Sequence, residues 1–209
     1  MDPNVWGPKL WDTLILAAFR LPKEDSLKVF SAMKQLIPCT HCLNSYVYYY
    51  SQIPPEKYLG PPEKWIWTIH DMVNQKLGKH TAPYSRIELR FKTFTHPVSP
   101  YDIYDILLII ATQVKTQEAM LVFNEILPIY KKMIRPAELS EFLTTPSDDI
   151  VAETLWVHIL TCKNALHERV GETKVSRESA KAQYFDTPSP INTEKRQTST
   201  RSRRRRRGA

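Results

Sequence analysis

The chain is poor in cysteine, in glycine and in long apolar runs. Its 209 residues contain three cysteines and five glycines, and so few glycines among many helix formers predict an all-α protein. Cys162 is the only cysteine outside one closely spaced pair, so no second pair is present to complete a zinc site. Ile106 to Ala111, an apolar run as long as any in the chain, is far too short to cross a bilayer. The N-terminus also lacks the basic region followed by an apolar run of a signal peptide. We therefore expect no membrane association and no metal.

Net charge is confined to one end of the chain. Residues 171–209 hold 11 Lys and Arg against four Asp and Glu, a net +7 that equals the charge of the whole chain, so residues 1–170 are neutral. The charge distribution therefore gives no support to nucleic-acid binding by residues 1–170. The tail is rich in Ser, Thr, Gln, Lys and Arg and is expected to be disordered. Its run from Arg201 to Arg207 suits a nuclear-localisation signal, a nucleic-acid tether or a packaging tag.

The most informative stretch is Cys39-Thr40-His41-Cys42, which follows Pro38 and precedes a predicted helix over 43–51. Two thiols at this spacing can close a readily reversed disulfide. A helix N-terminus favours anions, so a thiolate there would be stabilised and reactive. The residues alone leave three interpretations open: a redox couple, half of a zinc site, or two buried apolar side chains.

A second pattern lies on a predicted amphipathic helix that Pro61-Pro62-Glu63 begins and Gly78 ends. Trp67, His70 and Asn74 are spaced three and four apart, so all three project from one face. An indole, an imidazole and a carboxamide suit a flat heteroaromatic ligand that carries ribose and phosphate groups. Another helix is predicted from Ser26 to Ile37, because its apolar residues recur every three to four positions.

Three motifs together resemble a known family. They are Trp6-Gly7-x-x-x-Trp11, then Pro38-Cys39-x-x-Cys42, then Trp65 followed by His70, Val73-Asn74, and Leu77-Gly78-Lys79. In this order, over about the first 95 residues, they are similar to the FAD-linked sulfhydryl oxidases of the Erv/ALR type. The resemblance implies a four-helix bundle that binds FAD, with a short fifth helix and a usually dimeric state.

The resemblance also implies roles for individual residues. Cys42 would lie against the flavin, and Cys39 would be the outer sulfur that exchanges with an incoming dithiol. The positions that match FAD-binding residues of the family are Gly7, Trp11, His70, Asn74, Lys79 and Tyr84. Electrons would pass from a substrate dithiol through Cys39 and Cys42 to FAD and then to dioxygen, giving hydrogen peroxide.

Some positions depart from the family pattern. The family's Leu-His, Tyr-Pro and His-Asn pairs and one helix cysteine correspond here to Leu14-Ile15, Leu21-Pro22, His70-Asp71 and Trp67. Many members also carry a second, shuttling cysteine pair, which a single further cysteine cannot supply. We therefore expect Cys162 to be a buried thiol and Cys39 to take electrons directly from an external dithiol protein, of thioredoxin-like kind.

The sequence thus predicts an oxidase domain over 1–96, a helical unit of unknown role over 97–170, and a disordered Arg-rich tail over 171–209. Such a tail on a minimal oxidase is typical of a viral member that works in the host cytoplasm or in the virion, with the mitochondrial intermembrane space as the alternative. Two other functions stay open. One is a non-enzymatic helical virion or nucleic-acid-binding protein, and the other is a thiol–disulfide exchanger without flavin.

Overall fold

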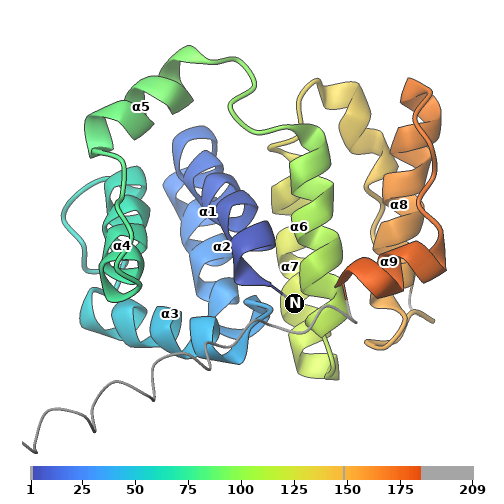
Figure 1. Ribbon diagram of the computed structural model, residues 1–209, viewed down its shortest axis with the longest axis horizontal. Helices are drawn as coiled ribbons and strands as arrows, with labels where there is room; N and C mark the ends of the chain where they lie inside the picture. The colour runs from blue at the N-terminus through green and yellow to red at the C-terminus, as the bar shows by residue number, and fades with distance from the viewer. Residues whose placement is uncertain (1, 148, 185–209) are drawn as a thin grey trace, which may run out of the picture.

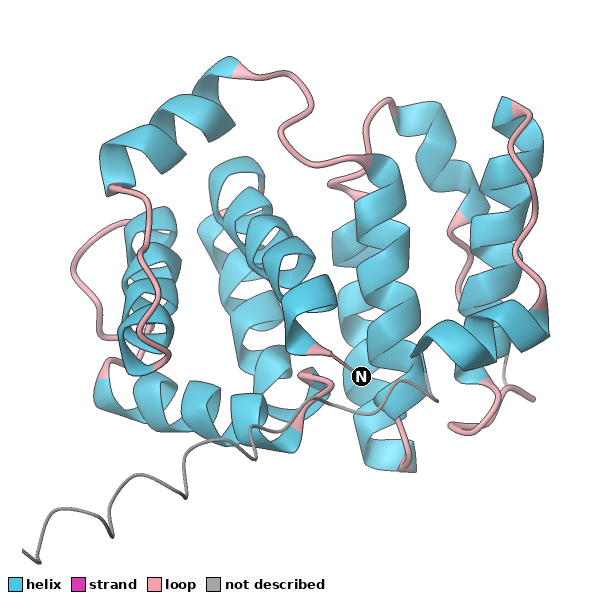
Figure 2. Ribbon diagram, in the orientation of Figure 1, coloured by secondary structure: helices cyan, strands magenta, loops and turns pink. Residues whose placement is uncertain are grey.

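The computed structural model describes residues 2–147 and 149–184, and every regular element in these ranges is helical (Figures 1 and 2). The predicted all-α class is therefore confirmed. The elements are α1 (Pro3–Arg20), α2 (Lys23–Leu36), α3 (Thr40–Gln52), α4 (Pro62–Lys76), α5 (Tyr84–Thr93), α6 (Pro100–Gln113), α7 (Gln117–Lys131), the 3-10 helix η1 (Ala137–Phe142), α8 (Leu155–Val170) and α9 (Arg177–Tyr184). None of the described helices combines the length and apolarity that a membrane span requires.

Helices α1 to α4 form a four-helix bundle, and α5 lies across one end of it (Figure 1). α1 packs against both α2 and α4, and α3 joins α2 to α4. The bundle is closed by side chains such as Leu14, Phe30 and Trp65, all of which are at least 99% buried. α5 is fixed to α1 because the Arg90 guanidinium makes two hydrogen bonds to the Asp12 carboxylate, at 2.9 and 2.7 Å.

The second helical unit packs on the outer sides of α1 and α2. α6 lies against α1 and α7 against α2, while α8 packs on α6 (Figure 1). One hydrophobic core continues through both units. A partly buried ion network crosses the junction: the Asp105 carboxylate of α6 accepts from Lys9 of α1 and from Lys163 of α8, both at 2.6 Å. The boundary predicted at residue 96 stays a prediction.

The prediction that the disordered tail begins at residue 171 is wrong. Residues 172–184 contain the helix α9 and make specific contacts with α8. Asn164 and Val175 exchange two hydrogen bonds of 2.9 Å, and Ala180 is fully buried. Composition favoured disorder here, but reciprocal side-chain to backbone bonds outweigh it locally. The Arg201–Arg207 run lies outside the described residues.

Candidate functional site

A cavity of about 350 Å³ opens between α1, α3, α4 and the segment after α4. Its wall contains six of the eight positions to which the sequence assigned a role in catalysis or cofactor binding: Gly7, Trp11, Cys42, His70, Asn74 and Lys79, but not Cys39 or Tyr84. The lining residues are Pro3, Asn4, Trp6, Gly7, Pro8, Leu10, Trp11, Asp12, Ile37, His41, Cys42, Ser45, Tyr46, His70, Val73, Asn74, Lys76, Leu77, Lys79 and His80.

Of the two paired cysteines, Cys42 lines the cavity and Cys39 does not. Cys39 is the N-cap of α3, and its Sγ accepts a hydrogen bond from the backbone N–H of Cys42 at 3.3 Å. Cys42 sits in the first turn of α3 and lines the cavity, whereas Cys39 is half-buried outside the lining. Both sulfurs are free thiols in this structure. The arrangement gives one sulfur to the cavity and leaves the other for a partner outside it.

The Cys42 thiol is not a stabilised thiolate in this reduced form. Burial raises its pKa to about 12, and the neighbouring Cys39 sulfur adds to the rise, while Lys76 opposes it. The expectation that the helix N-terminus would make the thiolate favourable therefore does not hold for the dithiol state. Desolvation outweighs the helix dipole here because a half-buried anion loses more hydration than the nearby N–H groups return.

His70 is fixed by contacts from two sides. Its ring stacks on Trp11, with ring centroids 4.4 Å apart and planes inclined by 16°. The Asn74 carboxamide Nδ2 lies 3.1 Å from His70 Nε2 and 2.9 Å from Thr81 Oγ1. Burial lowers the pKa of His70 to about 4, although Asp71 acts in the opposite direction. His70 is therefore neutral at physiological pH and presents an uncharged ring.

Two buried nitrogens of lining residues have no hydrogen-bond partner in the described part of the chain. They are Trp6 Nε1 and His70 Nδ1. Since Asn74 donates to His70 Nε2, the neutral imidazole carries its proton on Nδ1, and both orphaned atoms are N–H donors. Buried donors without an acceptor are costly, so a bound ligand that offers acceptors would be stabilised here.

The remaining lining residues fit a flat, negatively charged ligand. A Cβ built on Gly7 would meet no atom within 4 Å apart from its chain neighbours and the nearby backbone of α1, so this position leaves open space beside the cavity. Lys76 and Lys79 supply positive charge, and Lys79 is held by Asn4 at 2.9 Å. Aromatic walls, unpaired donors and two cations match what a flavin with its phosphates requires, so the residues present fit FAD.

Comparison with known proteins agrees with this geometry. Residues 8–92, which run from the first turns of α1 to the last turn of α5, match the Erv1 / Alr family. Residues 8–92 form an Erv1/Alr domain. This family comprises FAD-dependent sulfhydryl oxidases.

One relative comes from a virus. The protein 347L of Invertebrate iridescent virus 6, which carries the provisional name of a FAD-linked sulfhydryl oxidase, is 28% identical to the chain over 102 residues. That alignment covers 41% of this chain and 90% of the relative. No solved structure is similar enough to count as a match. The family match thus concerns α1 to α5 rather than α6 to α9.

Two residues that the sequence analysis placed at the ligand site do not line the cavity. Trp67, which the sequence placed on the ligand-facing side of α4, instead donates from Nε1 to the Ala82 carbonyl at 2.9 Å. Tyr84 packs edge-on against Trp67, with ring centroids 5.9 Å apart. Both side chains support the segment between α4 and α5. The FAD contact predicted for Tyr84 therefore gains no support from the lining of this cavity.

Other lining residues were missed by the sequence analysis. Trp6, Ser45, Tyr46 and Lys76 all border the cavity. Lys76 lies one helical turn after Met72 and Val73, in the same turn of α4 as Asn74. Its spacing could therefore have identified it. Ser45 and Tyr46 gave no signal, since a serine and a tyrosine in a Tyr-rich helix look like ordinary packing residues. Ile15, at the position where the family often has His, is 99% buried in the bundle core.

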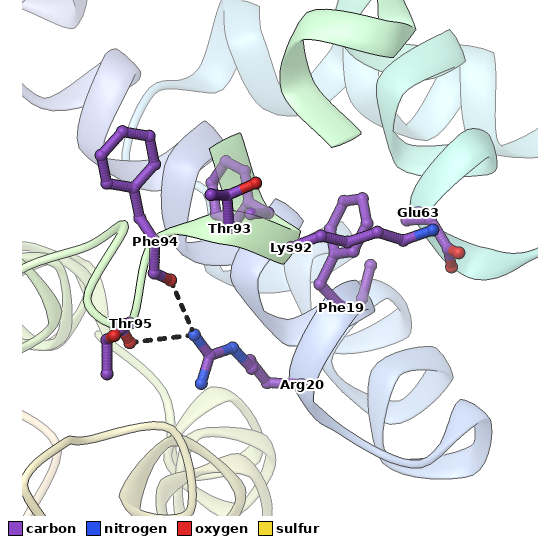
Figure 3. A pocket seen from close by; sticks show the side chains of 9 residues that line it. Phe19, Arg20, Glu63, Lys92, Thr93, Phe94 and Thr95 are labelled. Atoms are coloured by element: carbon purple, nitrogen blue, oxygen red, sulfur yellow. Dashed lines mark hydrogen bonds between the residues drawn. The ribbon is translucent and has the colours of Figure 1, made fainter. Parts of the chain in front are cut away.

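A second pocket lies between the end of α1 and α5 (Figure 3). The Arg20 guanidinium in its wall donates to the carbonyls of Phe94 and Thr95, at 3.2 and 2.9 Å. Arg20 is thus engaged in holding the chain, and no cysteine lines this pocket. The described residues also contain no cluster of three or more His, Cys, Asp or Glu that could hold a metal ion.

Proposed function

We propose that the protein is an FAD-dependent thiol oxidase that introduces disulfides into protein substrates. The observation that carries this proposal is that the two sulfurs differ in their position relative to the cavity. Cys42 faces a cavity together with Trp11, His70 and Asn74, and Cys39 lies beside it outside the lining. A non-enzymatic role for the Cys-x-x-Cys pair would not require this separation, nor the orphaned donors in the cavity.

The thiol chemistry follows from which sulfur a substrate can reach. In the oxidised protein a substrate thiolate attacks Cys39 Sγ, forming a mixed disulfide and breaking the Cys39–Cys42 bond, so that Cys42 leaves as the reduced sulfur. The second substrate thiol then attacks the substrate sulfur of the mixed disulfide and releases Cys39. The substrate has lost two electrons and two protons, and Cys39 and Cys42 have gained them.

The cavity residues would hold the cofactor beside Cys42. When bound, FAD would accept the two electrons from the dithiol and pass them to dioxygen, giving hydrogen peroxide. Trp11 and neutral His70 supply the aromatic wall, Trp6 Nε1 and His70 Nδ1 supply donors, and Lys79 supplies charge for the phosphates.

The natural substrate would be an external dithiol protein, directly or through a thioredoxin-like carrier. Cys162 is an unsuitable shuttle because it is 96% buried in α8, where its sulfur lies 3.5 Å from Thr144 Oγ1 and 3.7 Å from His158 Nε2. A homodimer would have to use faces other than those of α1 and α2 that α6 and α7 cover. The viral origin of the 347L relative is the support for action in a host cell. Within that setting, host cytoplasm or virion is our proposal, as is a nucleic-acid contact through the Arg201–Arg207 run.

Oxygen consumption with dithiothreitol as the thiol source tests the proposal. The FAD-loaded chain should turn over, Cys39→Ser and Cys42→Ser should each abolish turnover while Cys42→Ser still retains bound flavin, and Cys162→Ser should keep the parent rate. Oxidation of dithiothreitol by Cys42→Ser at the parent rate would overturn the assignment.

A further inference from the structure

We propose that Lys76 is a positioning residue for the thiol chemistry: its ammonium, held by Ser45 one helical turn from Cys42, favours the negatively charged form of the Cys42 sulfur. This inference rests on the proposed function, because it concerns the sulfur that faces the cavity. Neither the motifs of the sequence nor the family resemblance assigned a role to Lys76.

The geometry begins with Ser45, which is 92% buried on the cavity side of α3. Its hydroxyl donates to the carbonyl of His41 at 3.0 Å, and its Oγ accepts from Lys76 Nζ at 2.8 Å. Cys42 and Ser45 are three residues apart on α3, so their side chains lie on the same face. The hydroxyl therefore holds an α4 ammonium next to the turn that carries Cys42.

Lys76 is the cation that acts on this sulfur. Burial is the largest influence on the pKa of the Cys42 thiol and raises it, and the charge of Lys76 lowers it. The other cation near the cavity mouth, Lys79, is directed to Asn4 by a 2.9 Å bond. The remaining titratable groups of the lining are Asp12, His41, Tyr46, His70 and His80. A neutral His70 adds no charge, so the positive charge that acts on the Cys42 sulfur is that of Lys76.

The chemical need for such a cation arises when Cys39 is attacked. Cys42 then leaves as a thiolate in a half-buried wall, where desolvation penalises the anion. A positive charge held nearby lowers the free energy of that leaving group. Since Lys76 is solvent-exposed over much of its length, the effect is moderate and should weaken as salt screens the charge.

The test measures the thiolate fraction of Cys42 without relying on turnover. In the full chain carrying Cys39→Ser and Cys162→Ser, the rate of Cys42 alkylation by iodoacetamide is followed by mass spectrometry below the thiol pKa, where the rate is proportional to the thiolate fraction. Adding Lys76→Met should slow alkylation by about threefold to tenfold, as expected for losing one nearby charge. Adding Lys76→Arg should restore most of the rate, and Ser45→Ala should slow alkylation in the same direction.

Lys28→Met is the matched control, because it removes the same charge from an exposed lysine that does not line the cavity. Equal rates in the Lys76→Met and parent chains would overturn the proposal. So would equal slowing by Lys28→Met, or an undiminished effect of Lys76→Met at high salt. The outcome is independent of flavin: a colourless chain would refute the proposed oxidase, yet the alkylation ratio would still decide the role of Lys76.

Discussion

The imidazole of His70 lies flat on the indole of Trp11, with ring centroids 4.4 Å apart, and this contact joins α4 to α1 at the cavity wall. Stacking and the bond to Asn74 hold the imidazole in one orientation. Burial then keeps it neutral, because a protonated ring in this position would be poorly solvated. The stacked pair therefore affects the stability of the folded protein as well as the geometry of the site.

Acid should destabilise the flavin-free protein through His70. Its pKa falls from 6.5 in the unfolded chain to about 4 in the folded one, so the unfolded state binds the extra proton between these values. The stabilisation is complete above pH 6.5, decreases as the pH falls toward 4, and amounts to about 3 kcal/mol. Urea unfolding at a series of pH values measures this slope.

His70→Phe is the control for this pH dependence. Phenylalanine keeps an aromatic ring against Trp11 but cannot titrate, so the stability of the variant should change less between pH 6.5 and 4 than that of the parent. Parallel pH profiles for the two chains would show that another group causes the acid sensitivity.

The two cysteines should differ in reactivity toward a bulky disulfide reagent. In chains that also carry Cys162→Ser, Cys39 in the Cys42→Ser variant should react faster with Ellman's reagent than Cys42 in the Cys39→Ser variant. The reason is that Cys42 faces the cavity and burial raises its thiol pKa, whereas Cys39 lies outside the lining. Stopped-flow absorbance gives both rates, and a faster Cys42 would reverse the assigned order of the sulfurs.

The ion network at the junction of the two helical units should be sensitive to loss of its carboxylate. Burial alone would raise the pKa of Asp105, but Lys163 and Lys9 outweigh it and hold the pKa below its usual value. Asp105→Asn leaves Lys163, whose side chain is only 9% exposed, without its counter-ion. Removing one partner of a buried pair costs about 3 kcal/mol or more of unfolding free energy.

The exposed pair Lys92–Glu88 provides the comparison for Asp105→Asn. Its atoms are also 2.6 Å apart, but the two side chains are 61% and 36% exposed. Glu88→Gln should therefore change the unfolding free energy by less than about 1 kcal/mol. Denaturant titration of both variants suffices, and equal small effects would mean that the Asp105 network does not stabilise the junction.

Much of the first bundle was predictable, because its helix signals are local. Pro22, Pro38 and the Pro61-Pro62 pair separate the helices, and Gly78 adopts the left-handed conformation, with φ 66°, that ends α4. The convergence of Trp11, His70 and Asn74 on one cavity was also predicted, because their motif order matched a family with a known arrangement.

Other features depend on tertiary contacts that no local pattern encodes. Trp67 shares a helix face with His70 and Asn74, yet its indole turns to the Ala82 carbonyl because the segment after Gly78 folds back on α4. The link between Lys76 and Ser45 joins residues 31 apart in the chain. Helix α9 likewise forms where composition favours disorder, since Asn164 supplies hydrogen bonds from α8.

Removing the Arg201–Arg207 run should separate nucleic-acid binding from oxidase chemistry. An anchor of about six phosphate contacts gives a slope near −5 for the logarithm of affinity against that of salt concentration. Fluorescence anisotropy with labelled DNA should show this slope for the full chain and weak, shallow binding for a chain ending at residue 200. Unchanged binding after truncation would exclude the tether.

The most direct test of the central claim is the visible absorption spectrum of the purified protein before and after dithiothreitol is added without oxygen. The account predicts flavin bands that bleach with the thiol and return with hydrogen peroxide when air is admitted. The Cys39→Ser chain should keep the bands but fail to bleach at the parent rate. A colourless protein that FAD cannot reconstitute would contradict the account.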